Sequence, residues 1–464
     1  MLFNSFSFAV FMPVVWLLWL WGGPRFRKAV LLVGSYLFYA GGDPRFVPLL
    51  WLSTGIDYGV GLLLARAERR GLRRLLLGLS LVVNLGVLVG FKYLPFALAA
   101  LGVGGWEQAL STQSFHVWGL VPAGLSFYTF QTLSYTIDVY RKQTEPCRDP
   151  VEFALFVAFF PQLIAGPILR ADEFLPQLRA NRTPARREIV QGAELFALGL
   201  VKKVVIADNI GTLIDPVMRR PELYTGASVG VASLLFAAQI YCDFSGYSTM
   251  ARGLGHLFGF TMPRNFDSPW MQGTPLGYRR GWHITIARWF GDYVYKPLGG
   301  TRVSMPRAVF NIMLLWLLFG IWHGAGPTFA VWGLFNGVVH LLSYLAKRWG
   351  WRMPDYPGKR LVGVVLIGVF MMPSFLFFRV SSVSAGLVAL RRMAVLAPDG
   401  EDIFRYGWPA LLVLLVLHAV AFRWYDEDLL NRVGPVCRTL VFGGVALLLL
   451  VAAPAAQPFI YYQF

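Results

Sequence analysis

Long apolar segments recur along the whole chain, and they constrain its fold more than any other feature. A helix needs roughly 20 apolar residues to cross the hydrocarbon core of a bilayer. Short polar or basic loops separate the segments, and the predicted spans are residues 7–22, 29–41, 47–65, 75–91, 120–139, 189–212, 226–248, 308–326, 328–346, 361–379, 408–424 and 438–454. The pattern predicts an all-α integral membrane protein of about 11–13 transmembrane helices, folded as one embedded domain over residues 1–464.

Composition excludes most other classes of protein. Apolar residues make up 56% of the 464 residues and charged residues only 14%, whereas a soluble domain carries about 25% charged residues. Disordered, collagen-like, coiled-coil and ordinary soluble proteins are therefore excluded. The cysteines Cys147, Cys242 and Cys437 are far apart in the sequence, so they predict neither a disulfide framework nor a metal site.

The positive charge follows the loops rather than forming a surface for nucleic acid. Lys and Arg total 42 against 25 acidic residues, which gives a net charge of +17. Basic clusters at residues 25–28 and 66–74 follow the first and third spans. Since cytoplasmic loops are enriched in Lys and Arg, we expect a multi-pass membrane protein whose two termini face outward. Membrane lipid is the expected partner, and nucleic acid is not.

Residues 151–168 are apolar enough to span, but basic residues flank them on both sides. Pro161, Gly166 and Pro167 would interrupt a continuous helix. A re-entrant segment explains both observations, because non-helical backbone at membrane depth is tolerated only inside protein or along a cavity.

The longest polar stretch, residues 251–307, is rich in arginine and is predicted to be cytoplasmic. Within it Trp282, Ile286, Trp289 and Tyr293 recur at helical spacing. Because charged residues occupy other positions of the helical wheel, the pattern predicts an interfacial amphipathic helix near residues 279–295.

Two histidines stand in surroundings that suit chemistry. His323 ends an apolar span in the sequence GIWHGAGPTF, between Trp322 and small residues, and His283 lies in RRGWHITIARWF. An imidazole is the natural general base near neutral pH. His340 and His418 are single histidines in apolar spans, and for them a structural hydrogen bond to a neighbouring helix is the simpler interpretation.

Asp243 is an acidic residue within a predicted span, so it must pair with another group. The Lys202–Lys203 pair is the candidate partner. A structural ion pair and a role in binding substrate are both open for Asp243.

Several stretches resemble the membrane-bound O-acyltransferase superfamily, in particular its bacterial alginate O-acetylase branch. They are LVPAGLSFYTFQTLSYTIDVYR (120–141), ALFVAFFPQLIAGPILRADEFLPQL (154–178), GLVKKVVIADNI (199–210), IYCDFSGYS (240–248), NFDSPW (265–270), WHITIARWFGDYVYKPLGG (282–300) and GIWHGAGPTFAVWGLFNG (320–337). Where relatives often carry bulkier residues in the WH block, this chain has Gly281 and Gly291.

The resemblance implies helices around a tunnel that links the two membrane faces, with His323 as catalytic base and His283 close to the same tunnel. It also implies acetyl transfer from a cytoplasmic thioester, acetyl-CoA, to a hydroxyl group of an exported polysaccharide such as alginate. Acetyl-CoA would be a substrate, and no bound cofactor is expected. Relatives work with a periplasmic partner of serine-hydrolase-like fold, so the first acceptor is either that partner's serine or the sugar.

Further candidates for contact with substrate are Trp322, Asp243 and four cations that could bind the donor's phosphates, namely Arg279, Arg280, Arg288 and Lys296. An equally good interpretation is that these four cations are ordinary basic residues of a cytoplasmic loop. Two alternatives stay open at this point: a secondary transporter or polysaccharide-export channel, and a different acceptor such as teichoic acid or another cell-surface glycan.

Overall fold

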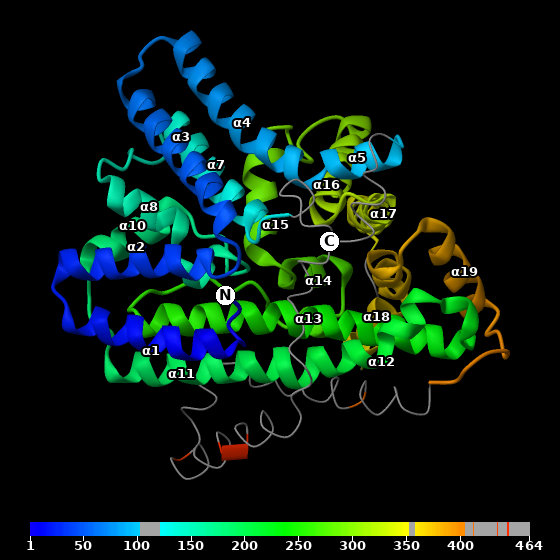
Figure 1. Ribbon diagram of the computed structural model, residues 1–464. Coiled ribbons are helices and arrows are strands. Elements are labelled where there is room, and N and C mark those ends of the chain that lie inside the picture. Colours follow the sequence, from blue (N-terminus) through cyan, green and yellow to red (C-terminus); the bar gives the residue numbers. More distant parts are fainter. Residues whose placement is uncertain (103–120, 352–357, 404–411, 413–433, 435–442, 445–464) are drawn as a thin grey trace. The chain divides into compact units, whose positions relative to one another are not determined.

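The computed structural model describes residues 1–102, 121–351 and 358–403, together with a few positions beyond (Figure 1). The described chain is helical, and its one bridge between extended residues joins Tyr224 and Glu401. Six of the described helical segments are long and apolar enough to cross a membrane: Pro44–Arg66, Arg70–Lys92, Gly226–Leu257, Met305–His323, Pro327–Arg348 and Lys359–Arg379. The prediction of an all-α, multi-pass membrane protein is confirmed. The predicted spans 408–424 and 438–454 lie almost entirely outside the described residues.

The chain folds into two compact units, the first comprising Met1–Gly199 and Tyr247–Pro263 and the second Leu200–Gly246 and Arg264–Phe464. A single domain over residues 1–464 stays a prediction. The first unit contains α1 (Phe6–Trp21), α2 (Pro24–Ala40), the 3-10 helix η1 (Pro44–Phe46), α3 (Val47–Arg66), α4 (Arg70–Lys92), α5 (Leu94–Ala100), α7 (Leu125–Tyr140), α8 (Pro150–Ala158), α9 (Phe160–Leu163), α10 (Ala171–Ala180) and nearly all of α11 (Arg186–Leu200).

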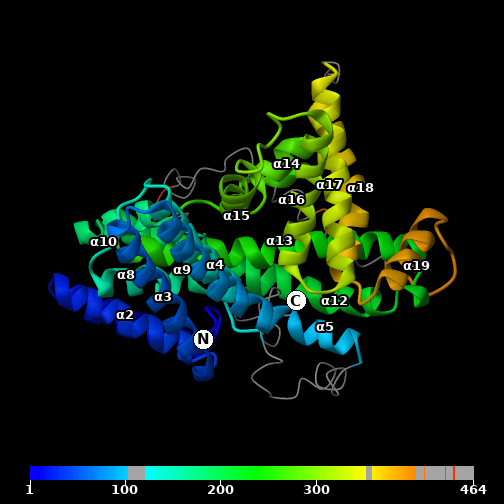
Figure 2. The same ribbon diagram turned by 90° about the horizontal axis from the view of Figure 1, so that it is seen from above.

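The second unit contains the π-helix η3 (Val201–Ala207), α12 (Asp208–Arg219), η4 (Pro221–Leu223), η5 (Pro269–Gln272), α14 (Pro275–Gly281), α15 (Ile284–Phe290), the π-helix η6 (Gly291–Tyr295), α16 (Met305–His323), α17 (Pro327–Arg348), α18 (Lys359–Arg379) and α19 (Val383–Ala394). The long helix α13 (Gly226–Leu257) begins in the second unit and ends in the first. Helix α17 packs against both α16 and α18 (Figure 2).

A buried carboxylate holds three apolar helices of the first unit together. Asp57 of α3 is fully buried. It accepts hydrogen bonds from the hydroxyl of Ser80 in α4, from Thr136 Oγ1 in α7 at 2.8 Å, and from Asn84 Nδ2 in α4 at 2.8 Å. Every one of these donors is neutral, so hydrogen bonds to uncharged groups satisfy the buried carboxyl oxygens of Asp57.

The segment predicted to be re-entrant is an interrupted helix. Helix α8 ends at Ala158, and α9 starts again after Phe159, whose backbone is not helical. Residues 155–169 are all buried. The backbone groups at the interruption find partners, since the Phe160 N–H donates to Ser35 Oγ at 3.0 Å and Gln162 Nε2 donates to the Phe156 carbonyl at 2.8 Å. The predicted break and its burial inside protein are confirmed, while the side of the membrane on which the segment starts and ends stays a prediction.

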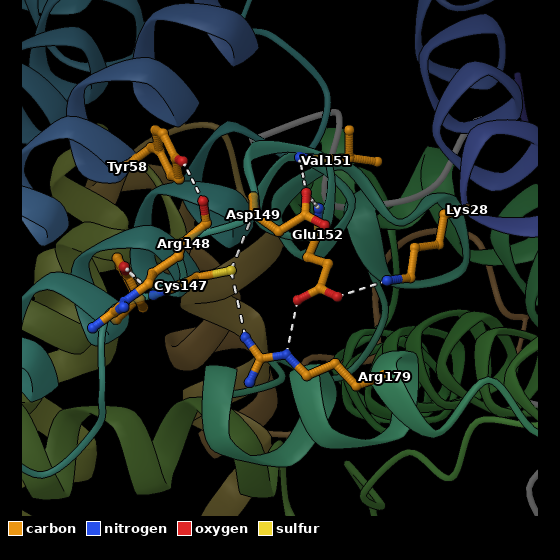
Figure 3. Close-up of polar contacts among 9 residues, drawn as sticks. Lys28, Tyr58, Cys147, Arg148, Asp149, Val151, Glu152 and Arg179 are labelled. Atoms are coloured by element: carbon orange, nitrogen blue, oxygen red, sulfur yellow. Dashed lines mark hydrogen bonds and ion pairs between the residues drawn. The ribbon is translucent and has the colours of Figure 1, made fainter. Parts of the chain in front are cut away.

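An ionic cluster fixes the start of that segment (Figure 3). The Asp149 side chain caps α8 by accepting a hydrogen bond from the Val151 N–H at 2.8 Å. The next carboxylate, Glu152, pairs with Lys28 Nζ at 2.6 Å and with Arg179 Nε at 2.8 Å. Since Lys28 belongs to α2 and Arg179 to α10, Glu152 ties α8 to two other helices of the first unit.

The segment near residues 279–295 differs from the single amphipathic helix that the spacing predicts. Two short helices, α14 and α15, are separated at Trp282 and His283, and His283 has a left-handed backbone with φ 43°. The amphipathic pattern itself is present in the second helix, where Ile286 is buried and Arg288 is exposed. The helix is interrupted because a left-handed residue cannot continue the right-handed backbone hydrogen bonding.

Candidate active site

Close packing of α16 on α17 determines the position of His323. A Cβ atom on Gly320 would lie 2.3 Å from the Phe329 carbonyl oxygen, and one on Gly333 would lie 2.4 Å from the Trp316 carbonyl oxygen. Only glycine permits such a close approach of two backbones, as is common where membrane helices pack. His323 is the last residue of α16, so this contact holds it against the first turns of α17.

Aromatic rings enclose the His323 imidazole, which is only 2% exposed. Its ring centroid lies 4.7 Å from that of Trp322, 4.8 Å from Trp332, 4.9 Å from Phe378 and 5.2 Å from Phe319. We call these four side chains the aromatic cage. They come from α16, α17 and α18, so three helices contribute to it.

His283 is fully buried, and the prediction that it lies on a surface helix is wrong. Its imidazole centroid lies 4.4 Å from the ring of Phe244 and 5.6 Å from that of Trp322. Asn265 stabilises the turn, because its carbonyl oxygen accepts the Ile284 N–H at 2.8 Å and its Oδ1 accepts the Thr285 hydroxyl at 2.6 Å. Burial lowers the pKa of His283 well below its ordinary value, because the charged form loses its hydration.

A cavity of about 710 Å³, measured with its mouth included, opens beside His323 within the second unit. Its wall is mainly aromatic and aliphatic, and it is formed by Ile240, Tyr278, Arg279, Trp282, Ala287, Phe290, Leu315, Trp316, Phe319, His323, Trp332, Asn336, Met371, Phe375 and Phe378. His323 therefore reaches the cavity, whereas His283 and Trp322 lie behind this wall. An apolar cavity with a few polar groups is the usual form of a small-molecule site.

The four candidate cations differ in their surroundings. Arg279 lines the cavity, and burial lowers the pKa of its guanidinium without removing its charge. Arg280 and Arg288 are exposed. Lys296 forms an ion pair with Asp292 Oδ1 at 2.5 Å, and its side chain is 74% exposed. Arg279 is thus the one candidate cation that the structure brings to the cavity.

Asp243 does pair with a lysine of the predicted pair. Its Oδ1 lies 2.5 Å from Lys203 Nζ, and the same nitrogen lies 2.9 Å from Asp208 Oδ1. Lys203 and Asp243 are almost completely buried. This arrangement favours the structural interpretation of Asp243, and contact of Asp243 with substrate stays a prediction.

His340 also has the structural partner expected for a histidine in an apolar span. The Trp316 indole N–H of α16 donates to His340 Nδ1 of α17 at 2.8 Å. His418 lies outside the described residues.

Sequence reasoning missed three residues of the site: Asn265, Trp332 and Phe378. Asn265 stands in the NFDSPW stretch, which offered a signal because an Asn before a helix often hydrogen-bonds to backbone. Trp332 and Phe378 are aromatic residues within apolar spans. Nothing in their local sequence distinguishes them from residues that face lipid, because their role depends on how separate helices pack.

Comparison with known proteins finds a matching family and several relatives of this chain. The family model described as MBOAT, membrane-bound O-acyltransferase family, matches residues 148–381, a range that contains His283, His323 and all of the cavity-wall residues named above. The chain is 40% identical over 341 residues to the probable alginate O-acetylase of Pseudomonas aeruginosa. The aligned residues cover 72% of this chain and 64% of that relative. The chain thus spans less than two thirds of the length of that curated relative.

Two other relatives carry different names. The peptidoglycan O-acetyltransferase of Helicobacter pylori is 34% identical over 400 residues, covering 80% of this chain and 74% of the relative. The teichoic acid D-alanyltransferase of Bacillus subtilis is 25% identical over 258 residues, covering 53% of this chain and 64% of the relative. From the extent of the family match and the identity to these relatives, the chain belongs to the membrane-bound O-acyltransferase family.

Proposed function

We propose that this protein is an O-acetyltransferase of the bacterial inner membrane. It transfers an acetyl group from a cytoplasmic thioester, acetyl-CoA, to a hydroxyl group of an exported polysaccharide. The observation that carries the proposal is the position of His323, a buried imidazole in the wall of an otherwise largely apolar cavity. The names of the relatives support a polysaccharide acceptor, and alginate is the first choice because several relatives at 39–40% identity are named alginate O-acetylases.

In the proposed reaction His323 accepts the proton of the acceptor hydroxyl group. The hydroxyl oxygen forms a bond with the thioester carbonyl carbon, the carbon–sulfur bond breaks, and the departing thiolate takes the proton from the imidazolium. The aromatic cage keeps bulk water away, which protects the thioester from hydrolysis. A periplasmic partner of serine-hydrolase-like fold is proposed to receive the acetyl group and pass it to the sugar, unless the sugar is acetylated directly.

Trp332 is the group that we propose to stabilise the oxyanion of this reaction. Its indole Nε1 is buried and has no hydrogen-bond acceptor among the described residues. Trp332 lines the cavity, and its ring lies 4.8 Å from that of His323. A hydrogen-bond donor that is already in position stabilises the negative charge of the transition state more than a donor that must first reorient.

The test uses the full chain purified in detergent, supplied with acetyl-CoA and alginate oligosaccharides. We expect release of free CoA that depends on the acceptor, together with acetylated sugar. The His323→Ala variant should lose roughly 10²–10⁴-fold in kcat, which is the usual contribution of a general base. His418→Ala is the matched control and should keep most of the activity.

Near-native kcat in a well-folded His323→Ala protein would remove His323 from the mechanism. Absence of CoA release by the wild type with alginate, peptidoglycan fragments, teichoic acid and a purified periplasmic partner would favour a transporter or export channel instead.

A further inference from the structure

A second cavity adjoins the first within the same unit of the chain. It has a volume of about 430 Å³ with its mouth included. Five residues line both cavities: Tyr278, Arg279, Trp316, Asn336 and Met371. The two cavities are therefore neighbours, and Arg279 lines the first cavity together with His323.

Among the described residues that line the two cavities, Arg279 is the one Lys, Arg, Asp or Glu side chain. Among the described residues no carboxylate forms an ion pair with it, and its Nε is buried without a hydrogen-bond acceptor. The charged neighbour that acts on it most is another cation, Arg280. A partly buried cation without a counter-charge is costly, and an anionic ligand would offset that cost.

The second cavity offers further polar groups near Arg279. Its wall includes His340 and Ser343. Because His340 Nδ1 accepts the Trp316 N–H, that nitrogen carries no proton, and the ring proton of neutral His340 is on Nε2. The second cavity thus has neutral donors beside one cation. The first cavity, which contains His323, has mostly apolar walls and suits an uncharged arm.

Resting on the proposed function, we infer that Arg279 binds a phosphate group of the thioester donor, whose uncharged acyl-bearing arm extends through the first cavity to His323. A guanidinium presents a planar set of donors that matches phosphate oxygens. A carboxylate of a uronate acceptor has similar chemistry. The donor is favoured because residues 251–307 form the basic loop predicted on the cytoplasmic side, where the donor is present.

Binding of CoA to the purified full chain, measured by calorimetry, tests the inference without requiring turnover. Arg279→Gln should weaken CoA binding roughly 10- to 100-fold, the range expected for loss of a charge-assisted hydrogen bond. Arg279→Lys, which keeps the charge but not the planar fork, should lose less. Arg302→Gln is the matched control, because Arg302 is an exposed arginine of the same polar stretch, and it should bind CoA like the wild type.

Steady-state kinetics with two donors separates phosphate binding from a general structural effect. S-acetylpantetheine carries the thioester and the uncharged arm but no phosphate. For Arg279→Gln we expect the KM for acetyl-CoA to rise about tenfold or more and the kinetic constants with S-acetylpantetheine to stay within about twofold of wild type.

Each other outcome would overturn the inference. Unchanged CoA binding by Arg279→Gln would refute it and leave the proposed function intact. If Arg279→Gln lowered kcat/KM equally with acetyl-CoA and with S-acetylpantetheine, Arg279 would have a structural role. If Arg279→Gln raised the KM for a uronate acceptor and left the KM for acetyl-CoA unchanged, the acceptor's carboxylate would be the group that binds Arg279. Absence of both CoA binding and CoA release in the wild type would refute the proposed donor and this inference together.

Discussion

The indole ring of Trp322 lies against the imidazole ring of His283, with the two centroids 5.6 Å apart. Trp322 also contacts His323, at 4.7 Å between ring centroids. Trp322 thus links a histidine behind the cavity wall to the histidine that reaches the cavity. This contact places His283 inside the protein, and not on the surface of the interfacial helix that the spacing of residues 279–295 predicts.

We expect His283 to influence catalysis through Trp322. His283→Leu and Trp322→Phe should each lower kcat more than they change the KM for acetyl-CoA. The two losses should not add in the double variant, because residues in contact commonly show coupling of about 0.5–3 kcal/mol. A double-mutant cycle on kcat measures this coupling. Additive losses in kcat would show that His283 does not act through its contact with Trp322. A rise in the KM for acetyl-CoA without a loss of kcat would also contradict this role.

Stability should depend on pH through His283. Burial holds its pKa in the folded protein well below the ordinary value of 6.5. Above pH 6.5 His283 is neutral in both folded and unfolded chains and contributes no pH dependence. Below 6.5 the unfolded chain takes up a proton that the folded protein does not, so stability falls by up to about 1.4 kcal/mol per pH unit.

Thermal unfolding between pH 7.5 and pH 5 checks this expectation. The Tm of the wild type should fall more steeply with acidification than that of His283→Gln, because glutamine does not titrate. Parallel curves for the two proteins would contradict it.

Trp332→Phe should lower kcat about 10²–10³-fold, which is typical for the loss of one oxyanion donor. Phenylalanine keeps an aromatic ring beside His323 but has no N–H, so the KM for acetyl-CoA should change little. Trp351→Phe, at a side chain that is 66% exposed, is the control for the same substitution. An unchanged kcat in Trp332→Phe would assign that indole a packing role only.

Gly320→Ala should destabilise the second unit by about 1–3 kcal/mol, the usual range for an overpacked contact. The new Cβ would lie 2.3 Å from the Phe329 carbonyl oxygen, so α16 and α17 would have to separate. Gly368→Ala in α18 is the matched control, because its Cβ would meet no atom within 4 Å. The midpoints of thermal unfolding of the two variants give the comparison, and equal values would argue against close packing of the two backbones.

The sequence predicts the membrane helices of this protein well and the site only in part. Helices such as α16 and α18 follow from local apolar length, and Pro161 and Gly166 mark the interruption after α8. His323 is recognisable from its small neighbours. The left-handed backbone of His283 cannot be recognised from the sequence. Trp282 and Ile286 have the same spacing in the sequence whether the helix is continuous or interrupted between them.

The aromatic cage has a kinetic consequence under the proposed mechanism. An imidazolium formed among these four rings has little water to stabilise it, so His323 cannot hold a proton while it waits for another molecule. The thioester and the acceptor hydroxyl must then be present at His323 together. The reaction is expected to be sequential, proceeding through a ternary complex of protein, donor and acceptor.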